Sequence, residues 1–104
     1  MIINRKRWLR GDGASMLCDM DGNKCCLGFY LESLGMTEEE MKGMGTPRQV
    51  NVPGSGQWLV SPGRNNSADG VDLMHANDER EQPDRERLIR ALFAAHGVRV
   101  EFEG

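Results

Sequence analysis

The chain has 104 residues, of which 38% are hydrophobic and 28% charged, as is ordinary for a soluble globular domain. Its formal net charge of −3 provides no overall field that would attract nucleic acid. No segment approaches the roughly 20 apolar residues that span a bilayer, and no apolar stretch follows the basic N-terminus as in a signal peptide. We therefore expect one domain over residues 1–104, in the cytoplasm and with no membrane partner.

The N-terminal residues predict two short strands. Residues 2–9 form the first expected strand, and residues 15–20 form the second, or the first arm of a hairpin. Asp21 and Gly22 make a turn dipeptide typical of such a hairpin, because glycine accepts a positive φ at little cost. This part of the chain therefore indicates antiparallel pairing.

Residues 24–34 predict the central helix. Apolar residues recur there at helical spacing, and Cys25 and Cys26 extend the apolar surface to nearly all sides. We expect such a helix to lie in the middle of the core. Gly28 would let the backbone of another element approach closely, and Gly35 would end the helix.

The next segment begins with a helix signal and then loses periodicity. Thr37 and Glu40 have the spacing of a capping box, which predicts a short helix ending at Gly43. Residues 44–70 are rich in glycine and proline and are expected to form loops. Within them, only residues 57–60 predict a short strand.

The C-terminal third predicts a second main helix and a last strand. Residues 71–76 fit either a strand or a helical turn, and Pro83 begins the clearest helix, which runs to about His96 before Gly97 caps it. Residues 98–102 alternate apolar and charged side chains, as in a half-buried strand. The order predicts an α+β fold in which two main helices pack on a small, mostly antiparallel sheet.

The three cysteines favour free thiols in a reducing cytosol, because their number is odd for a disulfide scaffold. Cys18 and Cys25 are the pair that could meet a metal across the hairpin, although structural zinc prefers a different spacing. Cys25 would also lie at a helix N-terminus, where the dipole lowers a thiol pKa, with His75 as a partner for catalysis. Buried, inert thiols are the preferred interpretation, so we predict no cofactor, no metal and no enzymatic activity.

Polar surface residues are the candidates for binding. The acidic run after Thr37 could engage a basic host surface, and an arginine beside glycine-rich loops could hold the phosphates of a nucleotide. An amide and a carboxylate near residue 77 could contribute to a site or cap a turn. The candidate contacts are Arg10, Glu38, Glu39, Glu40, Arg64, Asn65, Asn77 and Asp78.

Several blocks of the sequence form a pattern: Trp8-Leu9-Arg10-Gly11, Cys25-Cys26-Leu27-Gly28, Asn77-Asp78, Leu92-Phe93 and Val100-Glu101-Phe102. With these blocks the chain resembles a group of small uncharacterised proteins encoded by tailed bacteriophages and prophages. The resemblance covers both ends of the chain and little of the middle. It implies a bacterial cytoplasmic setting and an accessory role during infection, and it brings no catalytic residue with it.

Three functional hypotheses follow. The leading one is a phage-encoded accessory protein that binds and inhibits a host factor, such as a defence system, in the manner of an anti-CRISPR protein. Its partner would be a host protein or a protein–nucleic-acid complex. The alternative is a protein that sequesters a nucleotide signal, usually as a homo-oligomer. A thiol- or metal-dependent enzyme is the third.

Overall fold

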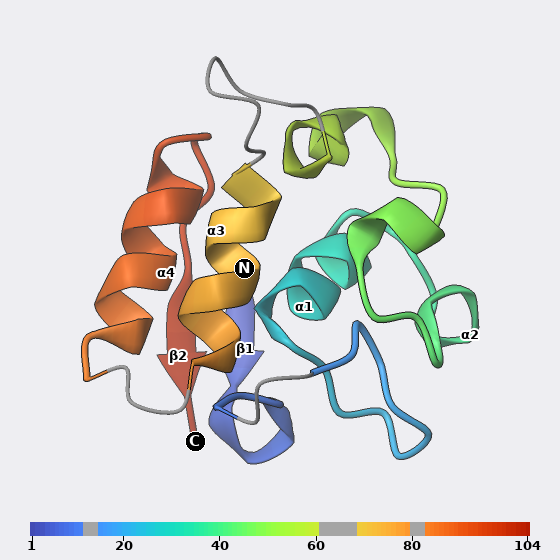
Figure 1. Cartoon of the computed structure of the whole chain (residues 1–104), viewed down its shortest axis with the longest axis horizontal. Coiled ribbons are helices and arrows are strands. Elements are labelled where there is room, and N and C mark those ends of the chain that lie inside the picture. Colours follow the sequence, from blue (N-terminus) through green and yellow to red (C-terminus); the bar gives the residue numbers. More distant parts are fainter. Residues whose placement is uncertain (12–14, 61–68, 80–82) are drawn as a thin grey trace.

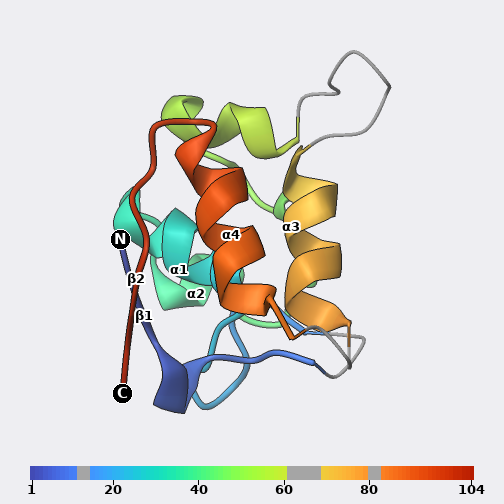
Figure 2. The ribbon, with the colours of Figure 1, turned by 90° about the vertical axis from the view of Figure 1, so that its left-hand side faces the viewer.

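The computed structural model describes residues 1–11, 15–60, 69–79 and 83–104 (Figure 1). In chain order its elements are β1 (Ile2–Asn4), a 3-10 helix (Arg5–Arg7), α1 (Cys26–Ser33), α2 (Glu38–Met41), two 3-10 helices (Pro47–Gln49 and Gly54–Leu59), α3 (Asp69–Asp78), α4 (Arg85–Ala94) and β2 (Glu101–Glu103). Figure 2 shows the sheet on one side of the molecule and α3 on the other, with α1 and α4 between them. No helix of the described residues is long and apolar enough to cross a membrane.

The two strands pair in parallel, so the predicted mostly antiparallel sheet is wrong. Ile3 lies opposite Phe102, which joins the two ends of the chain in one small sheet. The expected hairpin makes no regular ladder, although its arms are joined by backbone bonds from Asp19 to Asn23 and from Cys25 to Met16. The Asp19 carboxylate accepts two further backbone N–H groups within the turn. Residue 17 instead donates its N–H to Met44, and Cys18 accepts from Gly43.

α1 lies in the core, as predicted. Its buried residues are Cys26, Leu27, Gly28, Tyr30 and Leu31. A Cβ on Gly28 would lie 1.8 Å from the carbonyl oxygen of Leu17, so only glycine allows this approach. The prediction that another backbone packs at Gly28 is confirmed. Gly35, with φ +103°, follows the end of the helix as expected.

Other local predictions have mixed outcomes. The capping box of Thr37 and Glu40 is confirmed, since both of its hydrogen bonds form at the start of α2. The strand predicted at 57–60 is wrong: Trp58 lies in a 3-10 helix and packs its ring on Tyr30. Residues 71–76 belong to α3, where Leu73 and Ala76 are buried at helical spacing.

α4 closes the core from the side of the sheet. Ile89 and Phe93 are fully buried, and the Phe93 ring lies 5.2 Å from the ring of Tyr30 on α1. The helix, Arg85–Ala94, is about two residues shorter at each end than predicted. β2 follows it and places Phe102 5.0 Å from the ring of Trp8, between centroids. The hydrophobic core therefore joins α1, α4 and the sheet.

The close approach at Gly28 makes a stability prediction. We expect Gly28→Ala to destabilise the fold by roughly 2 kcal/mol or more, because overpacking here meets backbone rather than a side chain that can turn away. Chemical denaturation followed by circular dichroism measures the loss. Gly54→Ala is the matched control, since nothing lies within 4 Å of its added Cβ. Equal effects of the two changes would contradict the steric argument.

Candidate functional site

The cysteine pair lies at the start of α1 and is buried, together with Cys18. Burial raises the pKa of Cys25 to about 11 and raises that of Cys26 well above its ordinary value. The expectation that the helix dipole lowers the Cys25 pKa is therefore wrong, because desolvation of the thiolate outweighs it. The three thiols stay protonated at neutral pH and pack as small apolar groups.

Asn77 is a buried hydrogen-bonding centre with 1% of its surface exposed. Its Oδ1 accepts the indole N–H of Trp8 at 2.8 Å and the backbone N–H of Cys26 at 3.1 Å. Its Nδ2 lies 2.9 Å from both the Leu9 carbonyl oxygen and the Ser15 hydroxyl. The amide also donates to Asp78, whose carboxylate accepts from Ser15 as well. The side chain thereby reaches three separate parts of the chain.

The role of Asn77 is to cap a helix from outside that helix. Cys25 occupies the N-cap position of α1, but its side chain makes no capping bond. The Asn77 amide oxygen instead accepts the N–H of Cys26, the first residue of the helix. The prediction that Asn77 caps the turn that follows it is therefore wrong, because its amide lies near the end of α3 and caps α1, which begins 51 residues earlier in the sequence.

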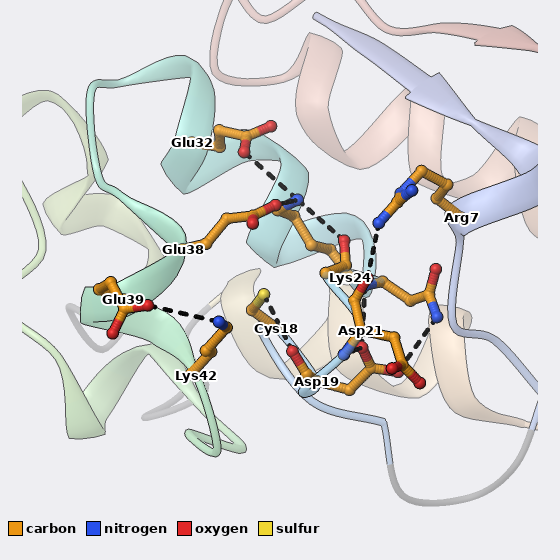
Figure 3. A network of polar contacts seen from close by, with 11 residues as sticks. Arg7, Cys18, Asp19, Asp21, Lys24, Glu32, Glu38, Glu39 and Lys42 are labelled. Atoms are coloured by element: carbon orange, nitrogen blue, oxygen red, sulfur yellow. Dashed lines mark hydrogen bonds and ion pairs between the residues drawn. The ribbon is translucent and has the colours of Figure 1, made fainter.

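The acidic run is largely engaged within the molecule. Figure 3 shows Lys24 between Glu32 and Glu38: its Nζ lies 2.6 Å from the Glu38 carboxylate and 3.3 Å from that of Glu32. Glu40 completes the capping box of α2. Glu39 and Glu40 are both exposed, and Glu39, with 86% of its side chain accessible, pairs with Lys42. Each of the three carboxylates is therefore engaged by a partner within the molecule.

The Lys24 network has a clear electrostatic cause. The Lys24 side chain is only 5% exposed, and burial alone would lower its pKa. The hydrogen bond with Glu38 and the charge of Glu32 outweigh burial, so the pKa of Lys24 is raised. The same bond lowers the pKa of Glu38. The ammonium group is thus held charged beneath the surface, where it ties α2 to the loop before α1.

Arg10 lies in an arginine hollow, a depression of about 430 Å³ at the start of α4. The hollow is lined by Trp8, Arg10, Pro83, Asp84, Arg85, Glu86, Arg87 and Arg90. Four arginines and two acidic residues therefore line one depression in a chain that is acidic as a whole. Among the sequence candidates that the structure describes, Arg10 alone lies here. Arg85, Arg87 and Arg90 were missed, although the predicted helix carries them within six positions.

Contacts within the protein hold two of these arginines in place. Arg10 lies over the indole of Trp8, 4.3 Å from the ring centroid, and donates to the carbonyl oxygens of Arg5 and Trp8 at 3.1 Å. Arg85 donates to the carbonyl oxygens of Ala76 and Glu79 at the end of α3. These guanidinium groups are therefore oriented by the fold before any ligand arrives.

The carboxylates of the hollow are also paired. Glu86 makes two hydrogen bonds with Arg5, at 2.7 and 2.9 Å, and these lower the pKa of the carboxyl group. Asp84 pairs with Arg87 at 2.8 Å on the exposed rim. Burial, followed by the charge of Arg85, lowers the pKa of Arg10. The arginines that line the hollow therefore outnumber its two carboxylates, and the hollow carries an excess of positive charge.

Two predicted binding residues, Arg64 and Asn65, lie outside the described residues. Asp78 lies beside Asn77 and accepts its hydrogen bond, away from the arginine hollow's lining. The described part of the chain contains no group of three or more His, Cys, Asp or Glu side chains arranged to hold a metal. Cys18, proposed with Cys25 for that role, directs its thiol to the carbonyl oxygen of Asp19.

Comparison of the chain with protein families, with curated proteins and with solved structures finds no match.

The hydrogen bonds of Asn77 predict a large loss of stability on its removal. We expect Asn77→Ala to destabilise the fold by roughly 3 kcal/mol or more, because the indole N–H of Trp8 and the N–H of Cys26 lose their acceptor in a buried site. Denaturant unfolding measures this. Asn51→Ala, at an exposed amide, is the control and should change stability little. A small effect at Asn77 would mean that water replaces the amide.

The Glu38–Lys24 bond predicts a dependence of stability on pH. The folded pKa of Glu38 is depressed, so its contribution is present above its ordinary pKa of about 4.3 and disappears as pH falls through the folded value. Glu38→Gln should lower the melting temperature at pH 7, and the difference from wild type should shrink towards pH 3. Glu39→Gln is the matched control. A difference that stays constant with pH would count against the ion pair.

Proposed function

We propose that this chain is a non-enzymatic binding protein that holds a phosphate-bearing ligand, such as a nucleotide, in the arginine hollow. The observation that supports this most is the presence of four arginines in the lining of one depression of an acidic chain. Guanidinium groups present planar sets of donors that match phosphate oxygens. The volume also falls within the range of small-molecule sites.

The electrostatics of the hollow favour an anion. Arg10 is partly buried beside Arg85 and Arg5, and its pKa is lowered first by burial and then by repulsion from these charges. A bound phosphate would replace that repulsion by attraction. The start of α4 lies in the lining as well, and its dipole adds positive potential there. The hydrogen bonds that orient Arg10 and Arg85 reduce the entropy lost on binding.

Binding without turnover is part of the proposal. The buried thiols argue against a thiol enzyme, because the pKa of Cys25, at about 11, leaves little nucleophilic thiolate at neutral pH. An accessory role in phage infection, within the bacterial cytoplasm, is also part of it and rests on the resemblance of the sequence blocks. Sequestering a host nucleotide signal would be one way to inhibit a host defence.

Inhibition through the acidic run is the weaker proposal. Glu38 and Glu40 would have to give up the bonds to Lys24 and Thr37 before they could engage a basic partner. Glu39 is widely exposed but is paired with Lys42. One surface carboxylate paired with Lys42 adds little to the affinity for a protein.

The test is binding of ATP and of inorganic pyrophosphate by calorimetry. We expect both to bind more weakly as salt rises, and Arg87→Glu to weaken binding about tenfold or more, since a charged hydrogen bond is lost and a repulsion gained. Arg87 is 77% exposed, so the change spares the core. Arg48→Glu makes the same change of charge outside the hollow and should leave the affinity unaltered. Absence of binding by either probe, or equal effects of the two variants, would refute the proposal.

A further inference from the structure

β2 is an edge strand whose open side borders a second hollow. The sheet of the described residues contains only β1 and β2, so β2 is paired on one side. The edge hollow, of about 580 Å³, is lined by Arg90 and Ala94 of α4 and by residues 98–103. Figure 2 shows β2 in front of β1, with α4 beside it. An unpaired strand edge offers N–H and C=O groups to any further strand.

Hydrogen bonds to the first strand determine which groups face this open side. The N-terminal amine of Met1 donates to the carbonyl oxygen of Arg99 at 2.8 Å, and the carbonyl oxygen of Met1 accepts from the N–H of Glu101 at 2.9 Å. Arg99 and Glu101 therefore direct their backbone groups towards β1. Successive residues of a strand alternate in this respect, so Val100 and Phe102 direct theirs to the open side.

We propose that residues 98–102, which lead into β2, pair antiparallel with the same residues of a second copy of this chain, with Val100 opposite Val100 of the partner subunit. The result would be a four-stranded sheet through the dimer axis, ordered β1-β2-β2-β1. Pairing would cover the apolar lining that Ala94 and Val98 provide in the edge hollow. This goes beyond the proposed function, because it involves another surface and another partner.

Charge selects this register among the symmetric ones. In an antiparallel pair, residues whose backbone groups point to the open edge must lie opposite residues of the same kind on the partner strand. The allowed registers are therefore those in which Val100 and Phe102 keep their backbone hydrogen bonds to the partner. Centred on Val100, Arg99 lies opposite Glu101 of the partner subunit, and symmetry repeats that pair. Centring on Arg99 would place two arginines face to face, and centring on Phe102 would place Glu101 opposite Glu103 of the partner subunit. Centring on Glu101 would bring Arg99 opposite Glu103 of the partner subunit but would also place two glutamates face to face, so only the register centred on Val100 has opposite charges without a like-charge contact.

The side chains needed for these pairs are accessible. Arg99 is 88% exposed and Glu101 52% exposed, and both stand on the same face of the strand. They already pair with each other within the chain at 3.3 Å. In the dimer, Arg99 would pair with Glu101 of the partner subunit instead of Glu101 of its own strand. These ion pairs favour the register centred on Val100, and neither charge is buried.

Sedimentation velocity on the full chain, from about 10 μM to about 1 mM, tests the proposal. We expect a concentration-dependent dimer. Val100→Pro should abolish it, because proline removes the outward N–H while the bonds from Arg99 and Glu101 to β1 remain. Circular dichroism melting confirms that each variant is folded.

Charge reversal tests the register. Glu101→Arg should weaken the dimer about tenfold or more, since it converts two attractive pairs into two repulsive ones, and combining it with Arg99→Glu should restore the affinity. Glu103→Arg is the control, because residue 103 faces no charged residue in this register.

Three outcomes would overturn the proposal. If the chain stays monomeric up to about 1 mM, β2 does not pair with a second copy, and its open edge would instead suit a strand of another protein. A dimer that survives Val100→Pro would lie elsewhere on the surface. Weakening by Glu103→Arg, without rescue by the double reversal, would show a register centred on Glu101. None of these results bears on the binding of ATP or pyrophosphate, so the two proposals fail separately.

Discussion

One buried amide, that of Asn77, sets the arrangement on which the rest of the structure depends. It fixes the indole of Trp8 by accepting its N–H and caps α1 by accepting the N–H of Cys26. The oriented indole then supports Arg10 on one side and touches Phe102 of β2 on the other. The indole therefore lines the arginine hollow and packs against Phe102, which lines the edge hollow. An amide in such a place is favourable only while its donors and acceptors are all matched, which makes the arrangement specific as well as stable.

The sequence predicted what is decided locally. The capping box of Thr37 and Glu40, the glycine that ends α1 and the close approach at Gly28 each depend on a few neighbouring residues and one backbone requirement. The sheet could not be predicted in the same way. The ends of the two strands are about a hundred residues apart, and alternation of side chains does not say whether two strands run parallel. The expected hairpin forms a turn but no ladder, because residues 17 and 18 of its first arm bond to Met44 and Gly43, far along the chain.

The charged residues also differ in how far the sequence predicted their roles. The acidic run was visible because its members are adjacent, yet adjacency reflected a helix cap and a buried lysine rather than a surface for a partner. Arg10 lies some 75 residues before Arg85, so no window of the sequence joins it to the three arginines of α4. Arg10 was a candidate contact in the sequence without its neighbours. In a small chain of net charge −3, tertiary structure is what combines these two separate basic segments.

The two hollows meet at Arg90, which lines both and lies over Phe102, 5.0 Å from the ring centroid. If a phosphate drew this guanidinium into the arginine hollow, its contact with the strand would weaken. If a second copy of the chain held it at β2, it would be less available to the phosphate. Because coupling between two binding events is reciprocal, each would change the affinity of the other by the same factor. A single side chain shared by two surfaces is therefore enough to link ligand binding to self-association in a protein of this size.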